Sequence, residues 1–187
     1  MEEKLKQTPS NCIKIVLFGP ESTGKTTLSK QLAEHYEGSW VPEYMREYLQ
    51  SKWDVTKEVC TYEDLIPIAE GQMKLENEFA KKSDKILFCD TNLLEIEVYS
   101  EAYYNGSVPE VIRKFSLENT YDLYLLTYID TPWVPDDLRD KPHQREEMFL
   151  RFKESLEKYN CNYITLKGDS ESRFKKAKNI IDQLIQE

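Results

Sequence analysis

The sequence feature that most constrains the fold is a Gly-rich octapeptide, G-x-x-x-x-G-K-T, near the N-terminus. It lies between an apolar, β-branched run at 12–18 and a segment at 27–36 whose apolar residues recur at helical spacing. A strand, this loop and a helix in that order are the context that a P-loop requires. The residues predicted to contact a nucleoside triphosphate are Gly19, Pro20, Glu21, Ser22, Thr23, Gly24, Lys25, Thr26 and Thr27.

The chemistry of this loop follows from its residue types. Glycine lets the backbone curl so that its N–H groups converge on phosphate oxygens, and the helix that follows adds its partial positive N-terminus. We expect Lys25 to reach the β- and γ-phosphates of ATP and the Thr26 hydroxyl to ligate Mg²⁺. An ordinary Gly-rich turn would not explain a Lys-Thr pair at the start of a helix.

Composition limits the other possibilities. The 187 residues are 40% hydrophobic and carry a net charge of −9, which predicts one folded domain over 1–187 and argues against general nucleic-acid or acidic-membrane binding. No signal peptide or transmembrane-length apolar run is visible, and the four cysteines form no C-x-x-C pair. We therefore expect a cytoplasmic protein with reduced thiols, acting on a small molecule, with homo-oligomerisation left open.

Short apolar runs alternate with helical patterns along the chain. Strands are predicted at 12–18, 39–43, 85–90, 122–128 and 162–167. Helices are predicted between them, one of them opened by a capping box at Thr61 and Asp64, and residues 1–10 read as a loose polar lead-in. Such alternation predicts an α/β P-loop fold in three layers, with a five-stranded parallel sheet covered by helices on both faces.

Polar residues at two strand ends are candidates for catalysis. Asp90 ends the apolar run 86–90, where an aspartate can order Mg²⁺ or act as a base, although it can also simply cap the next helix. Glu43 and Arg46 follow the second strand and should project beyond the carboxyl edge of the sheet. A carboxylate at that edge can accept the proton of a substrate hydroxyl. A surface Glu–Arg pair is the plainer alternative.

A polar segment at 130–145, with three prolines and two arginines, follows the fourth strand. Kinases of small molecules use mobile lids of this kind to exclude water and to bring arginines onto the transferring phosphoryl group. Arg139 and Arg145 are therefore predicted phosphate clamps, and Arg139 also a contact to the nucleotide. Without the P-loop, the same segment would be read as a solvated loop.

Three further side chains are candidate contacts to the second substrate. Tyr44 and Trp133 could stack on a planar base, although core packing is the default for either. Gln72 could read a carboxamide, although most helix glutamines are only solvated. With Glu43, Arg46 and Asp90 they complete the predicted acceptor site.

Several P-loop classes lack their signatures here. No Asn-Lys-x-Asp element or D-x-x-G switch is present, which disfavours a GTPase, and no L-S-G-G-Q segment is present, which excludes an ABC ATPase. The chain is also too short for the usual AAA+ core with its helical lid domain. A small-molecule kinase is the class that remains.

The sequence resembles the ribosylnicotinamide kinase domain of NadR-type bacterial NAD biosynthesis proteins. The resemblance runs from about residue 12 to 186 and is carried by the P-loop with its flanks, by P-E-Y-M-R-E-Y at 42–48, by F-C-D-T-N at 88–92 and by W-V-P-D-D-L-R at 133–139 with Arg145. It implies ATP-dependent phosphorylation of the 5′-hydroxyl of nicotinamide riboside, giving nicotinamide mononucleotide.

The resemblance also has limits. The family often has Asp-Thr-Asp where this chain has Asp90-Thr91-Asn92, which puts in doubt a second carboxylate there. The family's adenylyltransferase and DNA-binding functions lie outside the resembling domain, and they are not expected of these residues. The alternatives are another nucleoside, nucleotide or vitamin kinase of the same fold, or a regulatory ATP-binding protein.

Overall fold

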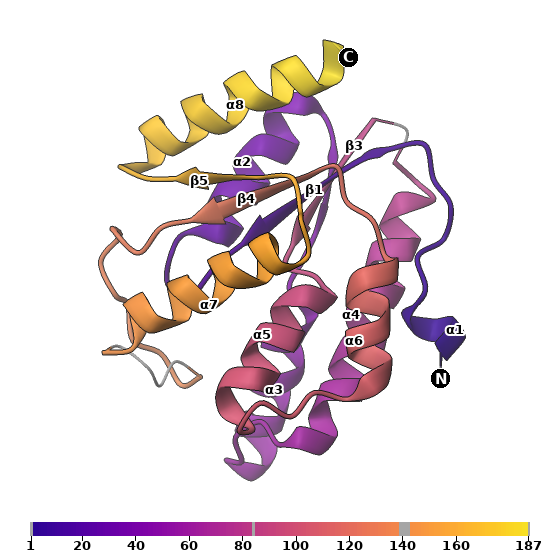
Figure 1. Ribbon diagram of the computed structural model, residues 1–187, viewed down its shortest axis with the longest axis vertical. Coiled ribbons are helices and arrows are strands. Elements are labelled where there is room, and N and C mark those ends of the chain that lie inside the picture. Colours follow the sequence, from indigo (N-terminus) through magenta and orange to yellow (C-terminus); the bar gives the residue numbers. More distant parts are fainter. Residues whose placement is uncertain (1, 84, 139–142, 187) are drawn as a thin grey trace.

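Five parallel strands form the sheet that positions the functional residues (Figure 1). In the computed structural model, residues 2–83, 85–138 and 143–186 are described. The strands are β1 (Ile13–Phe18), β2 (Ser39–Val41), β3 (Ile86–Asp90), β4 (Leu123–Thr127) and β5 (Tyr163–Leu166). Their spatial order is β2-β3-β1-β4-β5, with every neighbouring pair parallel. The predicted α/β P-loop fold is confirmed, and the strand bounds agree to within two residues.

Helices cover both faces of this sheet (Figure 1). On one face, α2 (Lys25–Tyr36) and α8 (Ser170–Gln186) pack on Ile15 and Leu17 of β1. On the other, α4 (Leu65–Ala80), α5 (Leu93–Tyr103) and α7 (Arg145–Lys158) pack on Val16 and Phe18. Successive side chains of a strand point to opposite faces, so a continuously apolar strand supplies both cores.

A third apolar cluster lies away from the sheet. It joins α4 and α5 to α6 (Glu110–Glu118), to the short α1 (Glu2–Leu5) and to α3 (Tyr44–Thr56). The predicted capping box is confirmed: Thr61 and Asp64 bond reciprocally around the 3₁₀ turn η1 (Tyr62–Asp64), which leads into α4. This helical layer extends beyond the carboxyl edge of β2 and β3 (Figure 1).

The expectation for the exit of the second strand was wrong. The second strand ends at Val41 and not at residue 43, because Pro42 lacks the N–H that would continue the ladder and α3 begins at Tyr44. A helix after this strand was weighed only as the setting of a surface Glu–Arg pair, and the bounds of α3 were not predicted. Its side chains are half-buried or exposed and none is buried, so the sequence carries a weak core-facing pattern.

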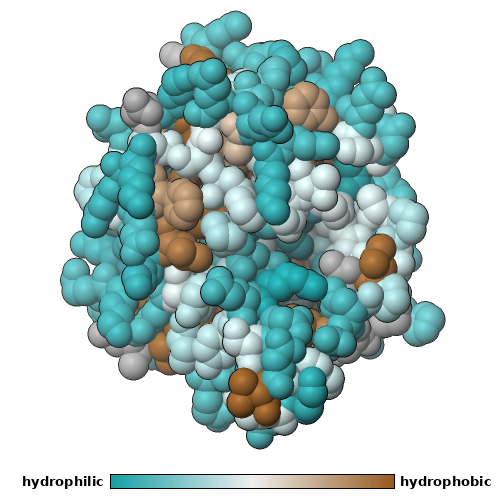
Figure 2. Space-filling model, turned by 180° about the vertical axis from the view of Figure 1, so that it is seen from behind, coloured by the Kyte–Doolittle hydropathy of each residue, from teal (hydrophilic) through white to brown (hydrophobic). Residues whose placement is uncertain are grey.

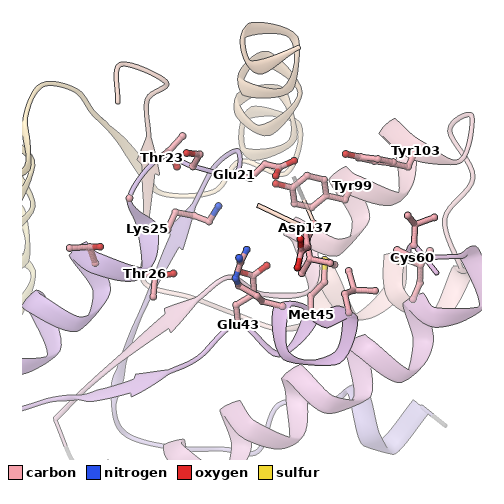
Figure 3. Close-up of a pocket in the computed structure, with 18 of the residues that line it drawn as sticks. Glu21, Thr23, Lys25, Thr26, Glu43, Met45, Cys60, Tyr99, Tyr103 and Asp137 are labelled. Carbon is pink, nitrogen blue, oxygen red and sulfur yellow. The ribbon is translucent and has the colours of Figure 1, made fainter. Parts of the chain in front are cut away.

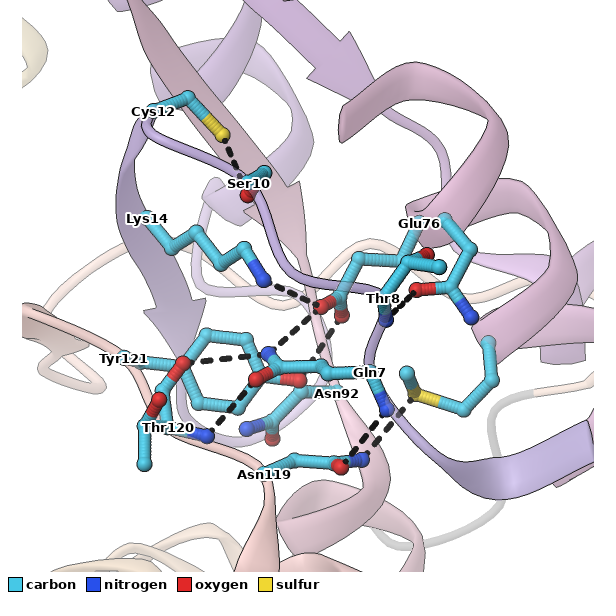
Figure 4. Close-up of polar contacts among 12 residues, drawn as sticks. Gln7, Thr8, Ser10, Cys12, Lys14, Glu76, Asn92, Asn119, Thr120 and Tyr121 are labelled. Carbon is cyan, nitrogen blue, oxygen red and sulfur yellow. Dashed lines mark hydrogen bonds and ion pairs between the residues drawn. The ribbon is translucent and has the colours of Figure 1, made fainter. Parts of the chain in front are cut away.

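The N-terminal segment is packed and not loose (Figure 4). Leu5 is fully buried in the third cluster, and Asn119 donates to its carbonyl oxygen at 2.9 Å. The Gln7 amide donates to Glu76 at 2.8 Å, and the Thr8 N–H donates to Asn77 at 2.8 Å. One apolar side chain among polar neighbours gives no periodicity, so the sequence could not reveal this anchoring.

The face of the molecule opposite to that in Figure 1 is mainly hydrophilic. Figure 2 shows one face on which hydrophobic residues occur in small separate groups. Within the described parts of the chain, no helix combines the length and apolar character needed to cross a membrane.

Candidate functional site

The P-loop connects the end of β1 to the start of α2 and takes a conformation that needs glycine. Gly19 has φ +135°, and a Cβ atom there would lie 2.8 Å from Thr127 Oγ1 and 2.9 Å from its carbonyl oxygen. Gly24 has φ +82° and is the N-cap of α2, where it offers no side chain to cap the first N–H groups. The loop and helix N-terminus thus form the anion-binding geometry that the motif predicts.

Buried hydrogen bonds hold the loop from behind. Thr23 Oγ1 donates to the carbonyl oxygen of Pro20 at 2.7 Å and shares a 2.7 Å hydrogen bond with Thr127 Oγ1. Arg173 of α8 is 4% exposed and donates to the Thr23 carbonyl oxygen at 2.5 Å, and it also bonds Asp130. Arg173 was not predicted, because it lies 150 residues from its partner and no local motif marks it.

Lys25 points inward from the first residue of α2. Its ammonium donates to the carbonyl oxygens of Gly19 at 2.5 Å and Pro20 at 3.0 Å, and it lies 3.4 Å from Glu95 Oε1. Burial lowers the pKa of Lys25, whereas the nearby carboxylates of Glu95, Glu43 and Asp90 raise it, and the net pKa lies above the ordinary value. The ammonium therefore stays charged beside the loop, as a phosphate ligand must.

Thr26 and Asp90 meet at the end of β3. Thr26 Oγ1 donates to Asp90 Oδ2 at 2.5 Å, and the other carboxylate oxygen, Oδ1, is buried with no hydrogen-bond partner among the described residues. Burial raises the pKa of Asp90, while the Thr26 hydrogen bond and Lys25 oppose that shift. A hydroxyl and an otherwise unsatisfied buried carboxylate oxygen are hard oxygen donors, so this pair fits Mg²⁺.

A cavity of about 520 Å³ opens in front of the P-loop (Figure 3). The P-loop forms one end of it, with Lys25 and Thr26 on the same side. Its other walls come from α3, the segment before η1, α5 and the segment after β4. The residues from these walls are Glu43, Met45, Arg46, Leu49, Val59, Cys60, Leu65, Tyr99, Tyr103, Tyr104, Asp137 and Leu138.

Glu43 and Arg46 lie where the two ends of the cavity meet. Glu43 is the N-cap of α3 and lines the cavity, in the position predicted from the exit of β2. Arg46, one turn later, also lines it and forms a 2.5 Å ion pair with Asp136, on the segment after β4. The structure therefore brings Glu43 and Arg46 together with the P-loop, and it connects α3 with the predicted lid segment.

Three tyrosines form a wall that sequence analysis missed. Tyr103 and Tyr104, at the end of α5, line the part of the cavity remote from the P-loop. Tyr99, one turn earlier, lines it beside Glu21 of the loop (Figure 3). Tyr104 is fixed by donating its hydroxyl to the Cys60 carbonyl oxygen at 3.0 Å, and Tyr99 packs edge-on against Phe152. Spacings of four and five residues on a helix are typical of core packing, so no signal marked them as cavity residues.

Three predicted substrate contacts lie elsewhere. Gln72 accepts from the Tyr44 N–H at 2.8 Å and donates to the Pro42 carbonyl oxygen at 3.3 Å, so its amide organises the start of α3. The Tyr44 ring lies against Gly71 and borders a groove on the other side of α3. Trp133 lies under the Arg145 guanidinium, with 5.7 Å between the guanidinium carbon and the ring centroid. It is not among the residues that line the cavity. None of the three lines the cavity, and their contact with the second substrate stays a prediction.

The predicted lid is attached to the P-loop at Ser22. Thr131 Oγ1 donates to the Ser22 carbonyl oxygen at 2.8 Å, and the Val134 N–H donates to Ser22 Oγ at 2.9 Å. Arg145 donates to the carbonyl oxygens of Thr131 at 2.8 Å and Ser22 at 3.2 Å, which places its guanidinium beside the loop as predicted. Arg139, the other predicted clamp, lies outside the described residues.

Comparison with known families shows to which protein family the chain belongs. A family model described as an AAA domain matches residues 14–173. The chain belongs to this AAA domain family. The length argument used above against AAA proteins was wrong for this family, because the matched region is itself shorter than the chain.

The same part of the chain is similar to the trifunctional NAD biosynthesis/regulator protein NadR. Identity is 27% over 176 residues for the Escherichia coli K12 protein and 26% for the Salmonella typhimurium LT2 protein. In both cases the similarity covers 92% of this chain but 43% of the relative. The chain therefore spans less than half the length of these curated relatives, and the predicted resemblance to the NadR family is confirmed.

Solved structures support the fold. A crystal structure of NadR protein in complex with NR has a TM-score of 0.81 at 21% identity, with 94% of this chain and 52% of that chain covered. Deoxyadenosine kinase from M. mycoides with bound dATP has a TM-score of 0.56 at 15% identity, with 91% of this chain and 99% of that chain covered. At these identities the likeness establishes the α/β P-loop architecture.

Proposed function

We propose that this protein is an ATP-dependent kinase that phosphorylates the 5′-hydroxyl of nicotinamide riboside to give nicotinamide mononucleotide. The observation that carries the proposal is one continuous cavity with the P-loop at one end, Tyr103 and Tyr104 at the other and Glu43 between them. The similarity to NadR over 92% of the chain supports the same reaction. We further propose that the chain acts as one kinase unit, in the cytoplasm, on a free small molecule.

The P-loop end is proposed to hold ATP. Lys25 would leave the Gly19 and Pro20 carbonyl oxygens and bind the β- and γ-phosphates, while the α2 N-terminus binds the phosphates through its N–H groups. Thr26 and Asp90 would hold Mg²⁺, which when bound neutralises phosphate charge. Arg145, beside Ser22, and Arg139 are proposed to close onto the phosphoryl group from the lid segment.

Glu43 is the proposed proton acceptor. It lines the cavity, whereas Asp90 lies behind Thr26, with one carboxylate oxygen already accepting from that hydroxyl. A base must reach the proton that it removes, and we therefore propose that Glu43 accepts the hydroxyl proton and that Asp90 holds the metal. Phosphoryl transfer needs little covalent chemistry from the protein beyond aligning the attacking oxygen with the γ-phosphorus.

The far end of the cavity suits a cationic aromatic ring. The nicotinamide ring of the riboside carries a positive charge, which the faces of tyrosine rings attract when the ring is desolvated. Tyr103 and Tyr104 provide such faces, and Asp137 and Glu43 add carboxylates to the same cavity. A neutral nucleoside would gain the stacking contact alone.

An acceptor panel tests the proposal. The wild-type protein would be mixed with ATP and Mg²⁺, and ADP release would be followed with nicotinamide riboside, adenosine, thymidine, deoxyadenosine and thymidylate as separate acceptors. We expect nicotinamide riboside to give the highest kcat/KM, by about tenfold or more over neutral nucleosides if cation–π attraction is worth roughly 1–2 kcal/mol. Activity with another acceptor alone would keep a kinase and overturn the substrate; hydrolysis without any acceptor would favour a regulatory ATPase.

A further inference from the structure

A buried carboxylate that sequence analysis did not single out lies behind the P-loop lysine. Glu95, in the first turn of α5, is 2% exposed, and its Oε1 lies 3.4 Å from Lys25 Nζ. Its other oxygen, Oε2, is buried with no hydrogen-bond partner among the described residues. Glu95 is not one of the cavity-lining residues, so it faces Lys25 from the protein side.

The start of α5 explains why Glu95, and not Asn92, is the side chain that reaches Lys25. Asn92, the N-cap, accepts from the Glu95 N–H at 3.3 Å and donates to the Tyr124 hydroxyl at 3.0 Å. Its side chain is therefore committed to the helix cap and the core. One turn later, Glu95 has the helix N-terminus to favour its negative charge and Lys25 as its ion-pair partner.

This carboxylate lies in a costly environment. Burial raises the pKa of Glu95, and Glu43 and Asp90 act in the same direction. The Lys25 ammonium, 3.4 Å away, opposes this shift and favours the ionised carboxylate. A buried charge with one partner and one unsatisfied oxygen does not help stability as an apolar side chain of the same volume would. An interaction with Lys25 therefore explains why a carboxylate is buried at this position, whereas packing does not.

The contacts of Lys25 show what that role is. An ammonium has three N–H donors, and here two go to the Gly19 and Pro20 carbonyl oxygens while Glu95 lies within ion-pair distance. The two loop carbonyl oxygens are neutral acceptors, so a phosphate can replace them at the ammonium. Glu95 is the charged partner of the ammonium, and we expect that contact to persist when the nucleotide binds.

We propose that Glu95 is a positioning residue for Lys25: it anchors the ammonium from behind while the loop-facing donors turn to phosphate, and its negative charge opposes ground-state binding of ATP. The effect on turnover rests on the proposed kinase function, whereas the effect on nucleotide binding does not.

Substitution of the charge alone tests this role. Glu95→Gln keeps the shape and removes the negative charge, so the Kd for Mg²⁺·AMP-PNP, measured by calorimetry without acceptor, should fall by about threefold to tenfold. In the acceptor assay, kcat should also fall by about tenfold, because the ammonium loses its charged anchor. Glu95→Asp keeps the charge but shortens the reach, so its Kd should stay at the wild-type value while kcat falls.

Glu97→Gln is the matched control. Glu97 is also buried on α5, but it accepts from Tyr159 at 2.6 Å and from Ser116, both away from the P-loop. Its substitution should leave Kd and kcat unchanged, whatever it does to thermal stability. Tighter binding with slower turnover in Glu95→Gln supports the proposal, since a merely structural residue does not bind nucleotide more tightly when altered.

Unchanged or weaker AMP-PNP binding by Glu95→Gln would overturn the positioning role. If wild-type protein phosphorylates no acceptor, the proposed function fails, and the direction of the Kd change still decides the role of Glu95. Intrinsic ATP hydrolysis would then replace the acceptor assay for the turnover comparison.

Discussion

The two ends of the cavity are built in different ways. The phosphate end comes from one contiguous run, residues 19–27. Its anion-binding groups are mainly the backbone N–H groups of the loop and of the start of α2. The other end is assembled from α3, the segment before η1, α5 and residues 137–138, which are far apart in sequence. A contiguous motif can be recognised in the sequence together with its chemistry. A wall made of distant segments exists only once the chain has folded.

The two ends also differ in how firmly they are held. Behind the P-loop, Thr23 and Arg173 are buried and hydrogen-bonded to backbone. At the other end, Val59 is 69% exposed and Tyr103 is 38% exposed, and the contact between α3 and the lid is a partly exposed ion pair. Elements of low local stability are the ones that move in binding, so we expect the phosphate end to bind nucleotide preformed and the acceptor end to adjust.

Removal of the P-loop charge should have the largest effect. Lys25→Ala deletes the ammonium that faces the phosphates, and turnover should fall by about 10³-fold, or about 4 kcal/mol of transition-state stabilisation. Lys74→Ala, an exposed lysine on α4, is the control for loss of a positive charge. Steady-state kinetics measures both; wild-type turnover by Lys25→Ala would mean that the phosphate end does not carry the chemistry.

A substitution in the apolar core below the acceptor end of the cavity should have the next largest effect, on the free energy of unfolding. Leu5→Ala opens a cavity in the cluster that joins α1, α4, α5 and α6, and it should cost about 3 kcal/mol of unfolding free energy in urea denaturation. AMP-PNP affinity should change little, because the P-loop packs on the sheet. Leu117→Ala, on α6 and 50% exposed, should cost less than about 0.5 kcal/mol. Equal costs for both leucines would mean that the N-terminal segment is loose after all.

The junction between the two ends should depend on Glu43. Glu43→Gln removes the proton acceptor and keeps the shape, so kcat should fall by about 10²-fold, or about 2.7 kcal/mol, with nucleotide affinity nearly unchanged. Glu47→Gln, one turn later and exposed, should behave as wild type.

Asp90 supplies the contrast to Glu43. Asp90→Asn should mainly raise the Mg²⁺ concentration needed for half-maximal rate, because Asp90 faces the Thr26 hydroxyl. The reverse pattern, with Glu43→Gln shifting the Mg²⁺ requirement and Asp90→Asn slowing the chemical step alone, would exchange the two assignments.

The connection between α3 and the lid should have the smallest effect. Arg46 and Asp136 form a surface ion pair with side chains 44% and 26% exposed, so the pair is worth about 0.2–1 kcal/mol. Arg46→Ala should raise the KM for the acceptor by about fivefold or less and leave the KM for ATP unchanged. Arg151→Ala, which breaks an exposed pair with Glu147 on α7, is the control. A tenfold or larger loss of kcat would place Arg46 in the chemistry itself.

What could be predicted from sequence follows the same division. The P-loop, the five strands and the positions of Glu43 and Asp90 were predicted because each depends on a local pattern at a strand end. The tyrosine wall and Glu95 were missed because helical spacing does not show which face of α5 meets the cavity.

Contacts between distant segments have the same origin. Gln72 was read as a side chain facing solvent or ligand, and it binds the backbone at the start of α3, a helix whose bounds were not predicted. Leu5 was one apolar residue in a polar stretch, and its burial depends on α4 and α6, which are distant in sequence. Contacts that depend on an unpredicted element cannot be inferred from residue types alone.

The most direct test of the central proposal is product analysis with wild-type protein. Nicotinamide riboside, ATP and Mg²⁺ would be incubated with the protein, and ADP and the phosphorylated riboside would be quantified together by chromatography and mass spectrometry. We predict ADP and nicotinamide mononucleotide in equal amounts, with the phosphate on the 5′-oxygen. ADP without nicotinamide mononucleotide, or no turnover of either substrate, would contradict the proposal.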